Sequence, residues 1–327
     1  MLRLTSISMA AILLGGVASA AQFQLGGFNG LNNSYIAASN GGSLPVGFAQ
    51  KGYQNYLFLN AQNSGVLPTP GSLPFTSTGG LPPKDQLADP SNVSFNMIGN
   101  STYGLGNLSV NDWQATGGTG SSIQVGVNRQ YVTSAYTMLN NEFGGLGAID
   151  TSVAFYFGAS AGATTGLTEV LVNLTNNNGT AGNGQIRSVF NCVSGVVVPG
   201  CSTGTLAPSS TLSALINGTT TDTVTVTTNN IYSFAYTSLA LGSGTGNVQL
   251  DDQGFDFSHL YQDGTLNSSQ YLVNMVITEL GSGSSTATTP SQTALSAITV
   301  FTAPEPTTIL LFLSGLGVIG FKRFRRQ

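Results

Sequence analysis

The sequence predicts an all-β protein with the architecture of an antiparallel β-sandwich or jelly roll. Three observations support this fold class. Many short segments alternate apolar with polar residues, which is the period of a half-buried strand. Clusters of Gly, Asn, Ser and Thr separate these segments, and no long segment has the period of a helix. Residues 92–302 have room for about eight to ten such strands, which is enough for a two-layered sandwich.

Alternating apolar residues mark the predicted strands. The segment SSIQVGV places Ile123, Val125 and Val127 on one face. Similar alternation, or the same β-branched and aromatic composition, recurs in TSVAFYF, TEVLVNL, DTVTVTT, IYSFAYTSL, YLVNMVITEL and LSAITVF. Glycine and asparagine between the strands, as in Asn217-Gly218, predict turns. We expect one segment, SAYTMLNNEF (134–143), to form one or two turns of helix.

Composition divides the chain into four regions. The first has the layout of a secretory signal peptide, because Arg3 precedes an apolar stretch and then small residues at the cleavage positions. We therefore expect the mature chain to begin at Ala21. The second is an N-terminal region of strands and loops, the third is the sandwich, and the fourth is a separate C-terminal segment. Their bounds are 1–20, 21–91 (with a proline-rich loop at 63–91), 92–302 and 303–327.

The C-terminal segment has three parts in a fixed order. Pro304, Glu305 and Pro306 come first, then thirteen residues (309–321) that are apolar except for Ser314, then a basic cluster. As a helix, thirteen residues span about 20 Å, against roughly 30 Å of hydrocarbon in a bilayer. The sequence therefore predicts a short C-terminal transmembrane helix that is marginal as a permanent anchor. The basic cluster would stay cytoplasmic.

This order of triplet, short apolar helix and basic cluster resembles the PEP-CTERM sorting signal of Gram-negative bacteria. The resemblance implies an exported protein that is held transiently in the inner membrane and processed near Pro304-Glu305-Pro306 by an exosortase. It also implies a final place at the cell surface, commonly in company with extracellular polysaccharide. The alternative is an ordinary single-span anchor that follows a chance Pro-Glu-Pro triplet.

Charged residues are sparse and mostly acidic. Residues 21–303 contain four basic and twelve acidic side chains, a net charge of −8. A nucleic-acid binder needs a positive surface, so nucleic acid is excluded as a partner. The apolar content is too high for a disordered chain. Solubility must come from Asn, Ser, Thr and Gly, and neutral polar surfaces of this kind suit contact with sugars.

Two cysteines, Cys192 and Cys201, lie close together in NCVSGVVVPGC. In an oxidising compartment such a pair predicts one disulfide. Metal binding by this pair is disfavoured, because the spacing is wrong for zinc and the chain has a single histidine.

The segment GASAG (158–162) matches the nucleophile-elbow pattern, with Ser160 at its centre. Aspartates and then His259 follow in the chain order of an α/β-hydrolase. That fold needs parallel strands alternating with helices, which the sequence lacks. The prediction is a protein without catalytic activity, with His259 at the surface or half-buried. A serine hydrolase that uses Ser160 and His259 is the remote alternative.

Acidic residues gather in one part of the chain. Asp251, Asp252 and Asp256, with Asp263 nearby, are the densest charge in the mature protein. Carboxylates on a loop can bind Ca²⁺, although the spacing of an EF-hand is absent. The alternative is a set of solvated turn residues. The segments AYTMLNNEFGG and VQLDDQGFDFS are also loosely similar to galactose-binding-like jelly rolls.

Trp113 lies beside Asn111 and Asp112, and a flat ring next to amide and carboxylate groups is suited to stacking on a sugar. The alternative is a core tryptophan at the end of a strand. Together these features predict a surface-sorted β-sandwich that acts in the extracellular polysaccharide matrix. A carbohydrate-binding module with a defined glycan ligand is the main alternative.

Overall fold

The structure of the protein is a computed structural model. It describes residues 21–25, 48–52, 93, 95, 98–99, 110–115, 119–142, 147–177, 184–188, 190–192, 206–238, 244–281 and 292–303. The predicted signal peptide (1–20), the proline-rich loop (63–91) and the chain from Pro304 onward lie outside the described residues.

The described chain is almost entirely strand. Its strands are β1 (Ala21–Leu25), β2 (Phe48–Gly52), β3 (Ile98–Gly99), β4 (Val110–Ala115), β5 (Ser122–Gln130), β6 (Val132–Glu142), β7 (Ile149–Gly158), β8 (Thr168–Thr175), β9 (Phe190–Cys192), β10 (Ser209–Ile216), β11 (Thr220–Ser238), β12 (Gly244–Asp256), β13 (Tyr271–Glu279) and β14 (Gln292–Thr302). A short helix, α3 (Ser258–Gln262), follows β12. Within these segments, no helix is both long and apolar enough to cross a membrane.

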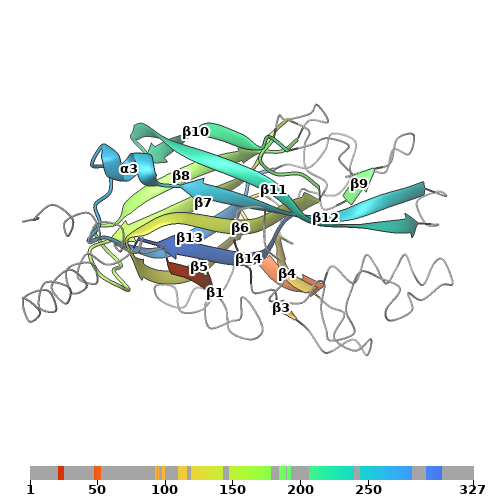
Figure 1. The fold of residues 1–327 in the computed structure, drawn as a ribbon, viewed down its shortest axis with the longest axis horizontal. Coiled ribbons are helices and arrows are strands. Elements are labelled where there is room, and N and C mark those ends of the chain that lie inside the picture. Colours follow the sequence, from red (N-terminus) through yellow and green to blue (C-terminus); the bar gives the residue numbers. More distant parts are fainter. Residues whose placement is uncertain are drawn as a thin grey trace, which may run out of the picture.

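The strands join one sheet, in the order β2-β4-β14-β6-β12-β11-β10-β8-β7-β13-β5. Outside this path, β1 pairs with β14, β3 with β4 and β9 with β12, and the strand pairs are antiparallel. The sheet curls around a core (Figure 1), because Phe155 on β7 meets Phe255 on β12 although three strands separate β7 from β12 in the order. This curled antiparallel sheet confirms the predicted all-β fold class.

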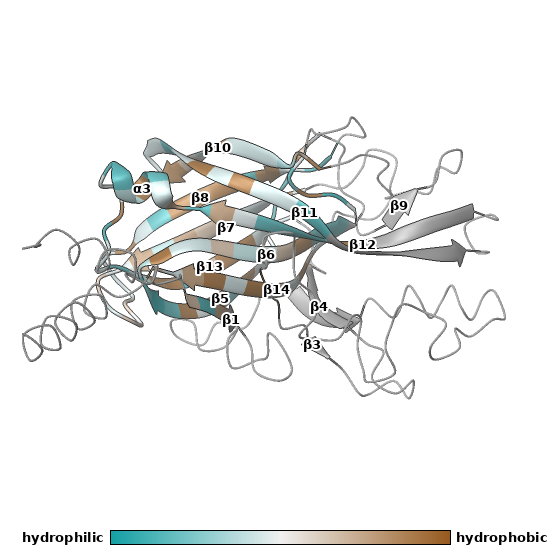
Figure 2. Cartoon of the chain, in the orientation of Figure 1, coloured by the Kyte–Doolittle hydropathy of each residue, from teal (hydrophilic) through white to brown (hydrophobic). Residues whose placement is uncertain are grey.

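Aromatic rings fill the centre of the curled sheet. The ring of Phe155 contacts those of Phe255 and Phe257 edge to face, with centroids 5.0 and 4.9 Å apart. Phe157 contacts Phe257 in the same way at 5.4 Å, and all four rings are fully buried. Figure 2 shows apolar and polar residues interspersed along the strands of this region. The predicted apolar face of β7, which also includes Val153, is confirmed as core.

Residues 134–142 form a strand, so the helical turns expected for 134–143 are wrong. They belong to β6, which pairs with β14 on one side and with β12 on the other. Ala135 and Leu139 join the apolar core, and Met138 is also fully buried. Two ladders of backbone hydrogen bonds and this burial outweigh the helical preference of residues such as Ala, Met and Leu.

A tight turn at Asn217-Gly218 joins β10 to β11. Both residues have positive φ, 49° and 70°, and Thr219 donates its backbone N–H to the carbonyl of Ile216 across the turn. Asparagine tolerates this region of backbone space and glycine enters it without strain, which is why this dipeptide closes the hairpin. The predicted turn is confirmed, and it sets the register of the strands that begin and end beside it.

Strands from the N-terminal region join the same sheet as the sandwich strands. β1 pairs with β14 along its whole length, with Phe23 opposite Val300. β2 pairs with β4, which in turn pairs with β14. The side chain of Phe23 packs against the core, and the guanidinium carbon of Arg129 on β5 lies 4.6 Å from the centre of its ring. β1 thus contacts both β14 and β5.

Candidate functional site

Most of the described segments that connect consecutive strands lie at one end of the curled sheet, and we call this end the rim. At the rim, Gln130 at the end of β5 pairs with Tyr271 at the start of β13, which pairs with Gly158 at the end of β7. The connection that carries α3 lies here, at the left of Figure 1, because Phe257 donates its backbone N–H to the carbonyl of Thr133. The rim comprises residues 128–133, 158–169, 216–222, 256–271 and 302–303.

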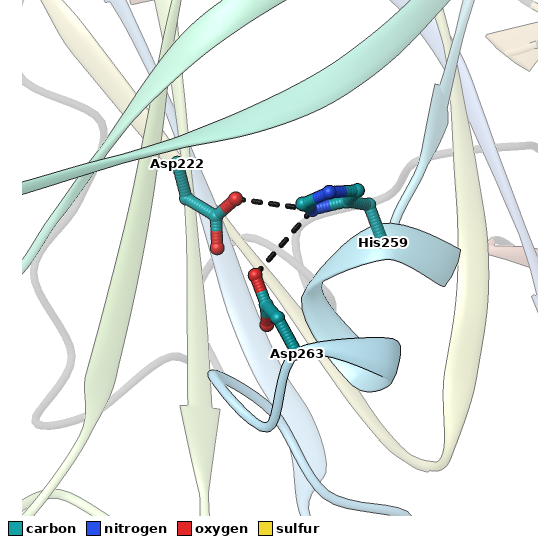
Figure 3. Close-up of side chains that lie close together, drawn as sticks. All are labelled: Asp222, His259 and Asp263. Carbon is teal, nitrogen blue, oxygen red and sulfur yellow. Dashed lines mark hydrogen bonds and ion pairs between the residues drawn. The ribbon is translucent and has the colours of Figure 1, made fainter.

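Three side chains with metal-binding groups meet at the rim (Figure 3). Nδ1 of His259 lies 3.1 Å from Oδ1 of Asp222 and 3.4 Å from Oδ2 of Asp263. His259 lies on α3, and Asp263 is four residues later, at the C-cap of that helix. Asp222 lies near the start of β11. The histidine side chain is 58% exposed, as predicted for a surface or half-buried residue, and that of Asp222 is only 10% exposed.

Thr265 orients both carboxylates of this cluster. Its hydroxyl donates to Oδ2 of Asp222 at 3.0 Å, and its backbone N–H donates to Oδ1 of Asp263 at 3.0 Å. That backbone hydrogen bond is the main cause that lowers the pKa of Asp263, and the nearby His259 acts in the same direction. Asp263 is therefore a carboxylate at neutral pH, and one oxygen of each aspartate remains directed at the imidazole.

The cluster has the donor atoms of a divalent-cation site. One ligand atom from each of Asp222, His259 and Asp263 lies within 4.8 Å of the others, and among the described residues this is the group in which such atoms converge. Tetrahedral ligands about 2.0–2.1 Å from a zinc ion lie roughly 3.3 Å apart, close to the two separations measured here. Without any ion, the contact between His259 and Asp222 also holds α3 against β11, as a charge-assisted hydrogen bond.

The acidic residues singled out in the sequence are not brought together. Asp252 accepts the backbone N–H of Asn229 at 3.0 Å, whereas Asp256 accepts that of Ser258 at 2.8 Å. Asp251 is fully buried and has other partners. Their carboxylates do not form a converging set of ligands in the described chain. The Ca²⁺ site at these three residues stays a prediction.

Asp251 forms a buried ion pair with Arg187. Nε and a terminal nitrogen of the guanidinium donate to the two carboxylate oxygens, at 2.8 and 2.6 Å. The side-chain amides of Asn140 and Asn230 donate to the same oxygens at 2.8 and 2.9 Å. The carboxylate is thus fully engaged by donors from three parts of the chain. It holds the segment 184–188 against β6 and β12, where Asn141 donates its backbone N–H to the carbonyl of Arg187.

Ser160 lies in the connection between β7 and β8. Its backbone carbonyl accepts the N–H of Ala163 at 3.2 Å, and β8 returns antiparallel to β7. A nucleophile elbow instead leads from a strand into a helix. The imidazole of His259 instead contacts the carboxylates of Asp222 and Asp263.

Two other predicted sites involve side chains that lie outside the described set. Trp113, with Asn111 and Asp112, is on β4, where its backbone pairs with Leu295 of β14. The position of its ring is not described, so the sugar-binding role stays a prediction. Cys192 ends β9 and Cys201 lies outside the described residues, so the disulfide also stays a prediction.

The sequence patterns did not single out Asp222, which is 37 residues before His259. Asp222 is the third residue of β11, shortly after the turn at Asn217-Gly218. In sequence it resembles any polar residue near the start of a strand. The antiparallel pairing of β11 with β12, in which Thr225 lies opposite Asp256, brings the start of β11 beside α3. A lone histidine four residues before an aspartate on a short helix was the one available signal.

The two ends of the sandwich meet at the rim. Ala21, the predicted first residue of the mature chain, pairs with Thr302, the last residue of β14. Ala303 donates its backbone N–H to the carbonyl of Tyr131 at 3.0 Å. Pro304, which follows directly, has no N–H to continue the ladder. The last described strand, β14, therefore ends just before the Pro-Glu-Pro triplet.

Comparison with known proteins identifies the C-terminal segment. The model of the PEP-CTERM protein-sorting motif matches residues 302–326. Among solved structures, the crystal structure of the Emp47p carbohydrate recognition domain aligns over 64% of this chain and 87% of that chain, with 9% identity and a TM-score of 0.18. A comparison with curated proteins gave no match. The motif confirms the resemblance noted in the sequence and implies export to the cell surface of a Gram-negative bacterium.

Proposed function

We propose that this protein is exported, processed by an exosortase and retained in the extracellular polysaccharide matrix, where it acts without catalysis. The observation that carries the proposal is the sorting motif at residues 302–326. In this account the apolar segment 309–321 holds the chain transiently in the inner membrane. Cleavage near Pro304-Glu305-Pro306 then releases the folded domain toward the surface.

The junction between fold and motif supports this order of events. The last strand, β14, ends at Thr302, and the hydrogen bond from Ala303 to Tyr131 closes the fold. Cleavage within the triplet would remove no residue of the sheet or core that the structure describes. A processed domain should therefore keep the stability of the uncut chain.

Two features support a non-catalytic role. Ser160 lies in a hairpin connection rather than at a strand-to-helix elbow. His259 directs Nδ1 toward the two carboxylates of Asp222 and Asp263, and a hydrolytic triad would also need its other nitrogen beside a nucleophile. The serine hydrolase that uses Ser160 and His259 therefore remains the remote alternative.

The main alternative is a carbohydrate-binding module with a defined glycan ligand, centred on Trp113, Asn111 and Asp112. In either case the scarcity of basic residues favours binding to polysaccharide through neutral polar and aromatic groups. Charge-driven binding weakens steeply with salt, whereas stacking and neutral hydrogen bonds persist.

Co-sedimentation with extracellular polysaccharide from the producing cells tests this proposal. We expect wild-type protein to bind nearly equally at low and moderate salt. Trp113→Ala should weaken binding by about 1–3 kcal/mol, by analogy with aromatic stacking on nucleic-acid bases. Trp113→Phe, the matched control, should retain most of the affinity.

Circular dichroism must show that both variants fold. A folded Trp113→Ala variant that binds like wild type would place the site elsewhere. Binding that collapses as salt rises would contradict recognition through neutral groups. Absence of binding by the wild-type protein would contradict association with the matrix.

A further inference from the structure

The pairing of β1 with β14 brings together the residues that adjoin the two predicted membrane segments in sequence. Ala21 lies opposite Thr302, and the register continues from Gln22–Phe301 to Leu25–Ile298. Ala21 follows the predicted signal peptide, and Thr302 is the first residue matched by the sorting motif. Both points of attachment therefore lie at the rim.

Only a few residues connect the rim to either apolar segment. Six residue steps separate Ala303 from Ile309, which is at most about 20 Å of extended chain. Four steps separate Ala21 from Val17, or at most about 14 Å. By contrast, β14 alone has 11 residues and places the opposite end of the sheet about 33 Å from the rim.

We propose that the rim is the surface of the folded domain that faces the inner membrane while the chain awaits C-terminal processing. The inference rests on the proposed function, because it assumes that residues 309–321 are inserted in the bilayer. The lipid surface is the partner, and the β1–β14 pair fixes the orientation. Hydrogen bonds on both sides of β14, to β1 and to β6, fix the point at which the tether is attached to the domain.

The charge of the rim indicates that the tether, rather than adhesion, keeps it at the membrane. Arg129 is exposed near this end, but the surrounding acidic residues outnumber it. These acidic residues are Glu169, Asp222, Asp256 and Asp263. Anionic lipid attracts basic patches and has no electrostatic attraction for an acidic surface. The domain should therefore leave the membrane once the tether is cut.

Cysteine accessibility in the full-length chain tests the orientation. One variant, Ser268→Cys, lies in the exposed turn at the rim, where the backbone carbonyl of Ser268 accepts the side-chain amide of Gln130. The matched variant, Ala148→Cys, lies in an exposed turn at the opposite end, beside Asn176. Each is produced in Gram-negative cells without an exosortase, and spheroplasts are treated with a bulky polyethylene-glycol maleimide.

Each labelling rate is divided by the rate with a small maleimide, and the parent chain with its native cysteines gives the background. We expect normalised labelling at Ser268→Cys to be several-fold slower than at Ala148→Cys. A 20-residue Gly/Ser spacer between Ala303 and Pro304, about 25 Å in mean span, should remove this difference.

Equal labelling of the two variants in the chain without the spacer would overturn the proposal. So would slow labelling at Ser268→Cys that persists with the spacer, because it would reflect shielding within the fold itself. Recovery of the chain in the soluble fraction, rather than with the membranes, would contradict the proposed sorting and the orientation together. Attachment to the membrane without protection of the rim would contradict the orientation alone.

Discussion

Replacing Asp251 with alanine is expected to lower the free energy of unfolding by about 3–5 kcal/mol, because it leaves a buried guanidinium without its carboxylate. Arg187 is almost fully buried and donates two hydrogen bonds to Asp251. The amides of Asn140 and Asn230 lose the same acceptor. Urea unfolding followed by circular dichroism measures the change.

Asp256→Ala is the matched control, since it removes a carboxylate from the end of the same strand. Asp256 is exposed and accepts the backbone N–H of Ser258. We expect its loss to cost no more than about 1 kcal/mol, the usual value of a hydrogen bond. If the two variants were equally stable, the buried pair would not be needed to hold 184–188 against the sheet.

Truncation of the central ring by Phe155→Ala is also expected to cost about 3–5 kcal/mol, as large cavities in a protein core do. Phe155 contacts Phe255 and Phe257, which come from the opposite part of the curled sheet. The cavity would therefore open between the two halves of the sandwich. A lower urea midpoint with an unchanged slope would show lost stability with the fold retained.

Leu215→Ala serves as the control for loss of apolar volume. Leu215 lies on β10 with 37% of its surface exposed, so its truncation leaves no cavity. We expect a change below about 1 kcal/mol. A Phe155→Ala variant as stable as Leu215→Ala would contradict the assignment of the aromatic cluster as the centre of the core.

The strands with a clear period of two could be predicted from the sequence. Val153, Phe155 and Phe157 are buried on one face of β7, and Asn217-Gly218 closes a hairpin. In these segments, local backbone preference and burial favour the same structure. The C-terminal motif was equally clear, because its parts are contiguous in the chain.

Elements whose structure depends on distant partners could not be predicted. β12 contains Asp251 and Asp252, which look like turn residues in sequence. They occupy a strand, where donors from neighbouring strands form hydrogen bonds with their carboxylates. The cluster of Asp222 with His259 likewise depends on the pairing of β11 with β12, in which Thr225 lies opposite Asp256, and no local pattern specifies that register.

The central claim is that the C-terminal segment is a sorting signal that is cleaved from the folded domain. Mass spectrometry of C-terminal peptides from surface-exposed protein tests it most directly. The account predicts that the last residue lies near Ala303–Pro306 and that the apolar segment 309–321 is absent. Surface protein that still carries Arg326 would contradict it.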